Sequence, residues 1–123
     1  MVWQVEFTDE FGEWWDSLSE REQDDLDTVV RVLEHEGPGL NEPLSKRIES
    51  SRHYPDMREL RISTAGGDRL RAFYAFDPRR TAILLIGGNK TGRWKKFYDE
   101  YISIADALYD EHLETIQKEQ GGR

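Results

Sequence analysis

Three cationic side chains in the middle of this 123-residue chain have the types and spacing needed to hold a phosphate group. Arg61 and Arg71 lie in two neighbouring predicted strands, and Lys90 follows a third strand in a glycine-bordered segment. A guanidinium stays charged and can bond two phosphate oxygens at once, and neighbouring arginines lower the pKa of a lysine toward neutrality. The pattern predicts a phosphate-binding site, with an ordinary solvated surface as the alternative interpretation.

The charge of the chain is unevenly distributed. The segment from Lys46 to Lys96 holds 13 of the 17 basic residues and only 5 of the 25 acidic ones, so it carries +8 inside a chain of net −8. The acidic total by itself argues against nucleic acid as a ligand. A basic surface flanked by acid can nevertheless bind polyphosphate locally while the protein stays soluble. A charged, solvated surface would give the same distribution.

Composition excludes several classes of site and location. The chain has no cysteine, so disulfides and thiolate metal sites are excluded and a cytoplasmic location is expected. The segment from Met1 to Phe7 lacks the pattern of a signal peptide, and no apolar run is long enough for a bilayer. His35, His53 and His112 follow no ligand spacing, so we expect surface or packing roles and neither a metal nor a cofactor.

Helical periodicity marks three segments that would frame the basic region. Thr8 or Asp9 can cap a first helix that runs to about Leu18, with its apolar residues at i, i+3, i+4 and i+7. Ser19 and Glu22 form a capping box for a second helix, which Gly37 and the proline after it should end. A long amphipathic helix starts near residue 94, and its apolar stripe includes Phe97, Tyr98, Tyr101, Ala105, Leu108, Tyr109 and Ile116.

Strand signals flank these helices. Alternation predicts strands at residues 2–7, 57–63 and 69–77, and a nearly all-apolar strand at 81–86. Residues 39–54 read as a loop with a short basic element at 46–48. If the apolar strand faces meet the helices, Arg61 and Arg71 stand together on an exposed face of the sheet, whereas Arg58 has the opposite parity and sits at the strand's entry or reaches round an edge.

The order β-α-α-β-β-β-α predicts one α+β domain over residues 1–123, with a small, mainly antiparallel sheet packed by helices. Residues 118–123 should be a frayed tail. The glycines from Gly87 to Gly92 should break the sheet and could offer backbone amides to an anion. They lack the glycine spacing of a Walker loop, which makes nucleotide hydrolysis a weak interpretation.

Three sequence segments in this order resemble the RelE/ParE toxin superfamily, in its phage-related HigB-like branch. They are Arg58-Glu59-Leu60-Arg61-Ile62, Arg71-Ala72-Phe73-Tyr74, and the strand exit from Leu84 to Gly92. The resemblance covers almost the whole chain. It implies a RelE-like fold and the toxin of a type II toxin–antitoxin module, neutralised by an antitoxin from the neighbouring gene; we expect a small helix-turn-helix protein there.

The resemblance also implies a chemistry, the metal-independent cleavage of mRNA, in some relatives on the ribosome. Arg61, Arg71 and Lys90 match the family residues that surround the scissile phosphate. The arginines would stabilise the phosphorane and Lys90 would transfer a proton. Tyr98 could be the other proton-transfer partner, although its place on the apolar stripe equally fits a core tyrosine with a solvated hydroxyl.

Further cations are expected to bind RNA backbone phosphates without sequence preference. These are Arg58, Lys46, Arg47, Arg93, Lys95 and Lys96. The alternative function is a binding protein without nuclease activity, either a ParE-like inhibitor of DNA gyrase or an inactive phage-derived module. Mapping of mRNA ends would separate these alternatives.

Overall fold

The computed structural model describes residues 2–121, which form a mixed five-stranded sheet between two layers of helix. The strands are β1 (Val5–Phe7), β2 (Ser45–Arg47), β3 (Met57–Ser63), β4 (Arg69–Phe76) and β5 (Ala82–Asn89). Their order across the sheet is β1-β5-β4-β3-β2; β1 runs parallel to β5 and the other pairs are antiparallel. The predicted α+β class is confirmed.

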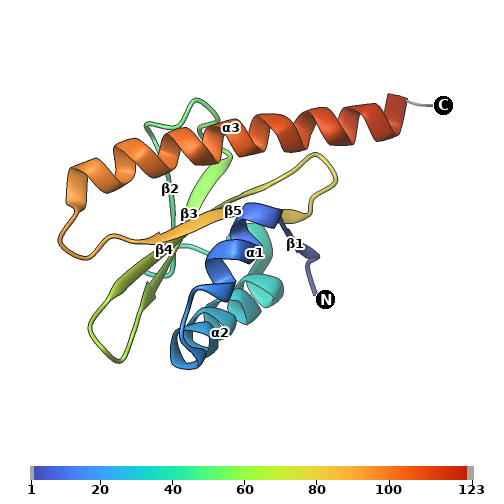
Figure 1. Ribbon diagram of the computed structural model, residues 1–123. Helices are drawn as coiled ribbons and strands as arrows, with labels where there is room; N and C mark the ends of the chain where they lie inside the picture. The colour runs from blue at the N-terminus through green and yellow to red at the C-terminus, as the bar shows by residue number, and fades with distance from the viewer. Residues whose placement is uncertain (1, 122–123) are drawn as a thin grey trace.

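The helices cover both faces of this sheet (Figure 1). Helices α1 (Asp9–Asp16) and α2 (Glu20–Glu36), followed by the 3-10 turn η1 (Gly37–Gly39), pack on one face. The long helix α3 (Trp94–Gly121) crosses the other face, and in Figure 1 its C-terminal turns project beyond the sheet. None of the described helices has the length and apolarity that a membrane span needs.

The predicted ends of α2 are confirmed. The Ser19 hydroxyl accepts from the Glu22 amide, and the Glu22 carboxylate accepts from the Ser19 amide, so both halves of the capping box form. At the other end Gly37 has φ of 61°, which glycine adopts without strain. A Cβ at that position would come within 2.3 Å of the Trp3 indole, so the glycine also makes room for the chain leading into β1.

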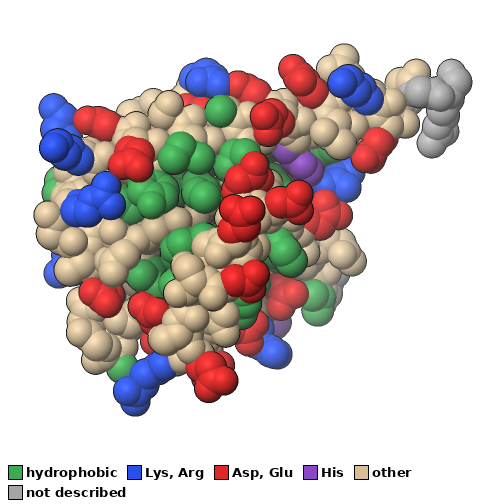
Figure 2. Space-filling view, in the orientation of Figure 1, with side chains coloured by type: hydrophobic (Ala, Val, Ile, Leu, Met, Phe, Trp, Pro, Cys, Tyr) green, Lys and Arg blue, Asp and Glu red, His purple; other side chains and the backbone are tan. Residues whose placement is uncertain are grey.

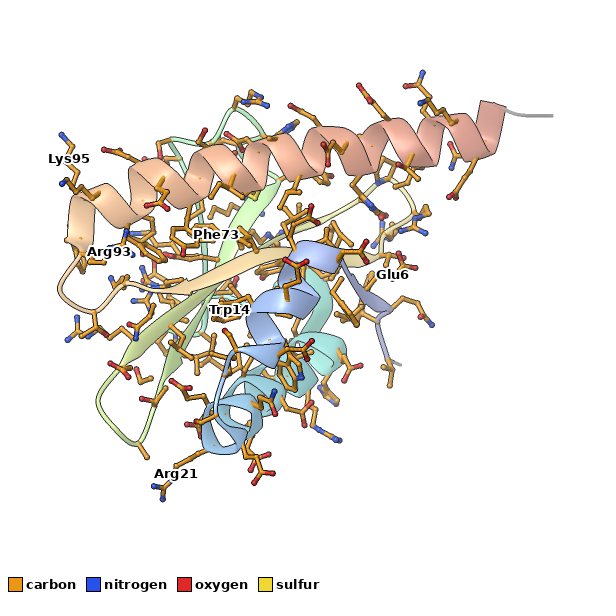
Figure 3. The ribbon with its side chains drawn as sticks, in the orientation of Figure 1. Glu6, Trp14, Arg21, Phe73, Arg93 and Lys95 are labelled. Carbon is orange, nitrogen blue, oxygen red and sulfur yellow. The ribbon has the colours of Figure 1, made fainter. Side chains whose placement is uncertain are left out.

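Two separate apolar clusters hold the layers together. Phe11 and Leu33 pack against Leu60 and Tyr74 on the α1–α2 side, while Phe97 packs with Phe73 on the α3 side. Figure 3 shows Phe73 beneath α3 and Trp14 between α1 and β5. Because α3 has its own core cluster, the expectation of one exposed sheet face is wrong.

The glycine run also behaves differently from the expectation. Strand β5 continues through Gly87 and Gly88 to Asn89 instead of ending at Ile86. A Cβ on Gly87 would come within 2.2 Å of Trp14, and one on Gly88 within 2.6 Å of Tyr101. Both glycines therefore sit within a strand and let aromatic rings approach the two faces closely, which corrects their interpretation as a phosphate-binding loop.

Two segments have a different secondary structure from the one that the sequence predicts: the basic element near residue 46 and the C-terminal end of α3. The basic element at 46–48 lies in a predicted loop, but Ser45–Arg47 pairs with β3 as an edge strand. Helix α3 extends to Gly121, so residues 118–121, which we expected to fray, are helical, while residues 122–123 and Met1 lie outside the described residues. Three residues make too short a run for periodicity to reveal, and only pairing with β3 defines β2 as a strand.

Candidate functional site

Arg61 and Arg71 are direct cross-strand partners, which confirms that they share a face of the sheet. That face is not open, because Arg71 is only 7% exposed beneath the start of α3. Each arginine is held by a hydrogen bond: Arg61 Nε donates to Glu59 Oε2 at 3.3 Å, and Arg71 Nε donates to the Tyr98 hydroxyl at 3.3 Å. Two like charges facing each other across paired strands repel, and here both arginines also lie close to one acidic side chain, Glu59.

Glu59 is only 2% exposed. Its Oε1 accepts a 2.7 Å hydrogen bond from Tyr98 and lies 3.5 Å from Arg71 Nε. Its other oxygen lies 3.3 Å from Arg61 Nη2. A buried carboxylate needs such partners, and here one carboxylate, one hydroxyl and two guanidinium groups form a connected network.

Sequence reasoning did not assign Glu59 to the site. The signal was present in the alternation of β3, because Glu59 and Arg61 share a strand face two residues apart. In composition, Glu59 is one of only five acidic residues in the basic segment from Lys46 to Lys96. Tyr98 was predicted either as a site residue or as a core tyrosine, and the structure shows features of both. Its ring contacts Phe73 in the α3 cluster, and its hydroxyl joins the polar network.

Lys90 follows β5 directly and lies beside this network. It is 3% exposed, and its ammonium lies 3.5 Å from the centre of the Trp94 ring and 5.4 Å from that of Tyr98. Burial, and then the positive charge of Arg71, lower the pKa of Lys90 to about 8. The predicted lowering is confirmed, with burial as a larger cause than the arginines. Desolvation and the hydrogen bond to Glu59 raise the pKa of Tyr98, so its hydroxyl remains a proton donor.

The site opens to solvent along the β3–β4 hairpin. A cleft of about 590 Å³ between this hairpin and α2 is lined by Arg61, Arg69 and Arg71, and Asp25 contributes an acidic group. A second cleft of about 520 Å³ is lined by Arg69, Lys90 and Trp94. Arg69 lines both clefts, so cationic side chains border each of them.

Arg93, Lys95 and Lys96 stand at the exposed start of α3, next to the second cleft. Figure 3 places Arg93 and Lys95 at this end of the helix, and Figure 2 shows Lys and Arg side chains gathered there. Arg93 is bonded to Glu100 at 3.0 Å.

The remaining predicted cations do not join this cluster. Arg58 points to the α2 side, where its Nη1 donates to the Pro38 carbonyl at 2.8 Å. Lys46 and Arg47 are exposed on the edge strand β2. The structure therefore gathers Arg61, Arg71, Lys90 and Tyr98 at one place and sets Arg58 apart from them.

His53 and His112 have the packing roles expected of them. They bond to Asp110 at 2.7 Å and to Asp77 at 2.9 Å. Asp106, which sequence reasoning did not single out, is buried on α3 and accepts a 2.5 Å hydrogen bond from Ser51. The contacts of Ser51 and His53 fasten the loop before β3 to α3, whereas the contact of His112 with Asp77 ties α3 to the turn after β4.

Residues 13–110 match the family described as "Phage derived protein Gp49-like". The chain belongs to this family. It is 41% identical over 85% of its length to the Mycobacterium tuberculosis protein named "Putative toxin HigB2", and 38% identical over 89% of its length to "Putative toxin HigB3" of the same organism. It spans 51% of the length of HigB2 and 90% of that of HigB3. The resemblance to the HigB-like branch is confirmed.

Solved structures show the same fold. The Escherichia coli toxin RelE in the free state, an arginine-to-alanine double mutant, superposes with a TM-score of 0.57 at 17% identity, covering 85% of this chain and 95% of RelE. RelE in the archaeal RelE–RelB complex from Pyrococcus horikoshii gives a TM-score of 0.54 at 20% identity, covering 76% of this chain and 99% of that one. The RelE-like fold is thereby shown.

Proposed function

We propose that this family member is the toxin of a toxin–antitoxin module and inhibits translation by cleaving mRNA without a metal ion. The observation that supports this function best is the network of Glu59, Tyr98, Arg61 and Arg71, with Lys90 beside it. The network joins a carboxylate to two guanidinium groups, and a lysine with a lowered pKa lies next to it. The names of the HigB relatives, which call them toxins, support the same function.

Each group has a task in the transfer of phosphorus from the 5′ oxygen to the ribose 2′ oxygen. The 2′-OH attacks the phosphorus and its proton passes to the Glu59 carboxylate. Arg61 and Arg71 bind the non-bridging oxygens as the phosphorane forms. The 5′ oxygen leaves with a proton from Lys90, whose pKa of about 8 keeps it mostly protonated at pH 7.

In the free protein both arginines are drawn to Glu59. The scissile phosphate would enter through the hairpin cleft, which both Arg61 and Arg71 line. Guanidinium groups have several donors, so each arginine can bind phosphate while keeping a contact to the carboxylate. Tyr98 holds the carboxylate in place through its 2.7 Å bond.

Neutralisation by an antitoxin belongs to the same proposal. Structures of the E. coli RelBE toxin–antitoxin complex and the P. horikoshii RelE–RelB complex contain the same fold with a bound partner. We expect the gene next to that of this chain to encode its antitoxin, a small helix-turn-helix protein. Co-expression of that neighbour should restore growth.

The decisive experiment is brief induction in bacteria followed by mapping of new RNA 5′ ends, compared between wild type and Arg71→Ala. We expect discrete cleavage within coding sequences for the wild type only. Growth arrest with intact mRNA and accumulating DNA breaks would contradict the nuclease and indicate a gyrase-directed activity. Repeating the mapping with purified mRNA, with and without ribosomes, shows whether cleavage needs the ribosome.

A further inference from the structure

A cavity at the edge of the sheet gathers a second set of cations. It measures about 540 Å³ and lies between β2 and the loops on either side of it. Its charged lining comprises Lys46, Arg47 and Arg58, together with Glu42 and Glu49, and Tyr54 contributes an aromatic ring. Both glutamates are exposed on the surface, whereas Arg58 is 9% exposed.

Arg58 is a buried cation that lacks a counter-ion in the described chain. Its Nη1 donates to the Pro38 carbonyl, its guanidinium lies 5.6 Å from the centre of the Phe76 ring, and its Nε has no hydrogen-bond partner. No carboxylate oxygen of residues 2–121 lies within 4.0 Å of it. Burial of an unpaired charge is costly, and an anion in the adjoining cavity would relieve that cost.

A second observation points the same way. Arg47 is the direct cross-strand partner of Arg58, so two like charges stand opposite each other on one face of the β2–β3 pair. Such a pair is destabilising unless something negative lies between its members. At Arg61 and Arg71 that negative group is Glu59. No carboxylate oxygen of residues 2–121 lies within 4.0 Å of Arg47 or Arg58, and Glu42 and Glu49 line the same cavity at longer range.

The aromatic residue in the same cavity indicates which kind of anion fits. Tyr54 is 51% exposed, and an exposed ring beside a phosphate-binding group is the arrangement on which single-stranded nucleic acids stack their bases. The edge strand also connects this cavity with the Glu59 side of the sheet. Lys46 pairs with Glu59 and Arg47 with Arg58, so consecutive residues of β2 offer cations to both faces.

We propose that the β2-edge cavity is a second nucleotide-binding subsite, in which Arg58 and Arg47 hold a backbone phosphate of single-stranded RNA and Tyr54 stacks on an adjacent base. The choice of RNA rests on the proposed function. The subsite binds RNA that passes round the edge of the sheet from the Glu59 network. It lengthens the bound segment and takes no part in bond breaking.

The test measures binding without cleavage. A fluorescent single-stranded oligonucleotide with 2′-O-methyl riboses cannot cyclise, and its affinity is measured by anisotropy over a range of salt concentrations. Arg47→Ala should weaken binding and reduce the salt slope by about one, because one phosphate contact is lost. Tyr54→Ala should weaken binding roughly 5- to 100-fold and leave the slope unchanged, because stacking releases no counter-ion. Lys118→Ala, an exposed cation near the far end of α3, is the matched control and should bind as wild type does.

Arg71→Ala, measured in the same assay, separates the two proposals. Loss of affinity in Arg47→Ala and Tyr54→Ala supports the subsite, whether or not Arg71→Ala also binds less tightly. Wild-type affinity in both edge variants overturns the subsite and leaves the nuclease to be judged by Arg71→Ala and by mRNA mapping. An acidic peptide serves as a competitor in the same assay. The assignment of the cavity to a nucleotide would be overturned if this peptide bound wild type more tightly than RNA does and displaced the oligonucleotide from wild type but not from Arg47→Ala.

Discussion

The hydroxyl of Tyr98 donates a 2.7 Å hydrogen bond to the carboxylate of Glu59, joining the first turns of α3 to the middle of β3. The two residues are 39 positions apart in the sequence. This bond fixes the carboxylate between Arg61 and Arg71, and it makes the docking of α3 a condition for the geometry of the site. The proposed reaction centre is therefore complete only when α3 is docked on the sheet.

Replacement of Arg71 should remove activity, and it should also lower the free energy of unfolding, because the buried Glu59 carboxylate loses one of its cationic partners. We expect Arg71→Ala to reduce the cleavage rate by about 10²- to 10³-fold, the usual loss when one group that stabilises transition-state charge is removed. Arg71→Lys should recover only part of this, because lysine lacks the two-pronged donor geometry. Cleavage of purified mRNA measures both. Equal growth inhibition by wild type and Arg71→Ala at equal expression would rule out the proposed mechanism.

The pH dependence of cleavage should report Lys90. If its protonated form supplies the leaving-group proton, the rate falls as pH rises through about 8, where the lowered pKa places its deprotonation. Lys90→Arg, which stays charged at all working pH values, should lose this alkaline fall while cleaving slowly. Rates between pH 6 and 10 test this. A wild-type rate that stays level to pH 10 would assign the proton transfer to another group.

Lys90 should contribute to function at a cost in stability. Its folded pKa lies below the unfolded value of 10.5, so the unfolded chain binds the proton more tightly between about pH 8 and 10.5. The free energy of unfolding therefore rises with pH across that window. At pH 7 the buried charge of Lys90 lowers the free energy of unfolding. Lys90→Met should keep or raise the melting temperature at pH 7 while abolishing toxicity. A marked drop in melting temperature would show that the contact with Trp94 outweighs the burial cost.

The docking of α3 depends on its aromatic contacts. Phe97 is fully buried and packs against Phe73 and Tyr101, so Phe97→Ala should cost about 3–5 kcal/mol of unfolding free energy. Leu108 lies on the same stripe but is only half-buried, so Leu108→Ala should cost less. Urea unfolding of both variants provides the comparison. A larger loss in Leu108→Ala would place the main α3 contact further along the helix.

Salt should weaken RNA binding steeply, because several phosphates are neutralised and release their counter-ions. Reversal of Lys95 and Lys96 to glutamate should flatten the salt dependence if the start of α3 lies along the bound strand. Reversal of Lys118 at the opposite end of α3 should change it little. Binding that does not respond to salt would remove the nucleic-acid interpretation of the basic segment.

The sequence alone determined the local structure and the types of the reacting groups. The capping box at Ser19 and Glu22, the glycine end of α2 and the periodicity of α3 depend on neighbours in the chain, so their signals are readable from spacing. Alternation along β3 and β4 likewise placed Arg61 and Arg71 on one face, and the register confirms it. The place of Lys90 after the third predicted strand added it to the same set, and the family resemblance agreed.

Only the tertiary structure decided how these groups are surrounded. Alternation cannot tell which helix covers a strand face, and so the burial of Arg71 and the inclusion of Glu59 depended on α3 packing across that face. The same holds for Gly87 and Gly88, whose lack of a side chain accommodates Trp14 and Tyr101 from opposite layers. Contacts between residues distant in the chain set burial, and burial decides whether a charged group is solvated, paired or poised to react.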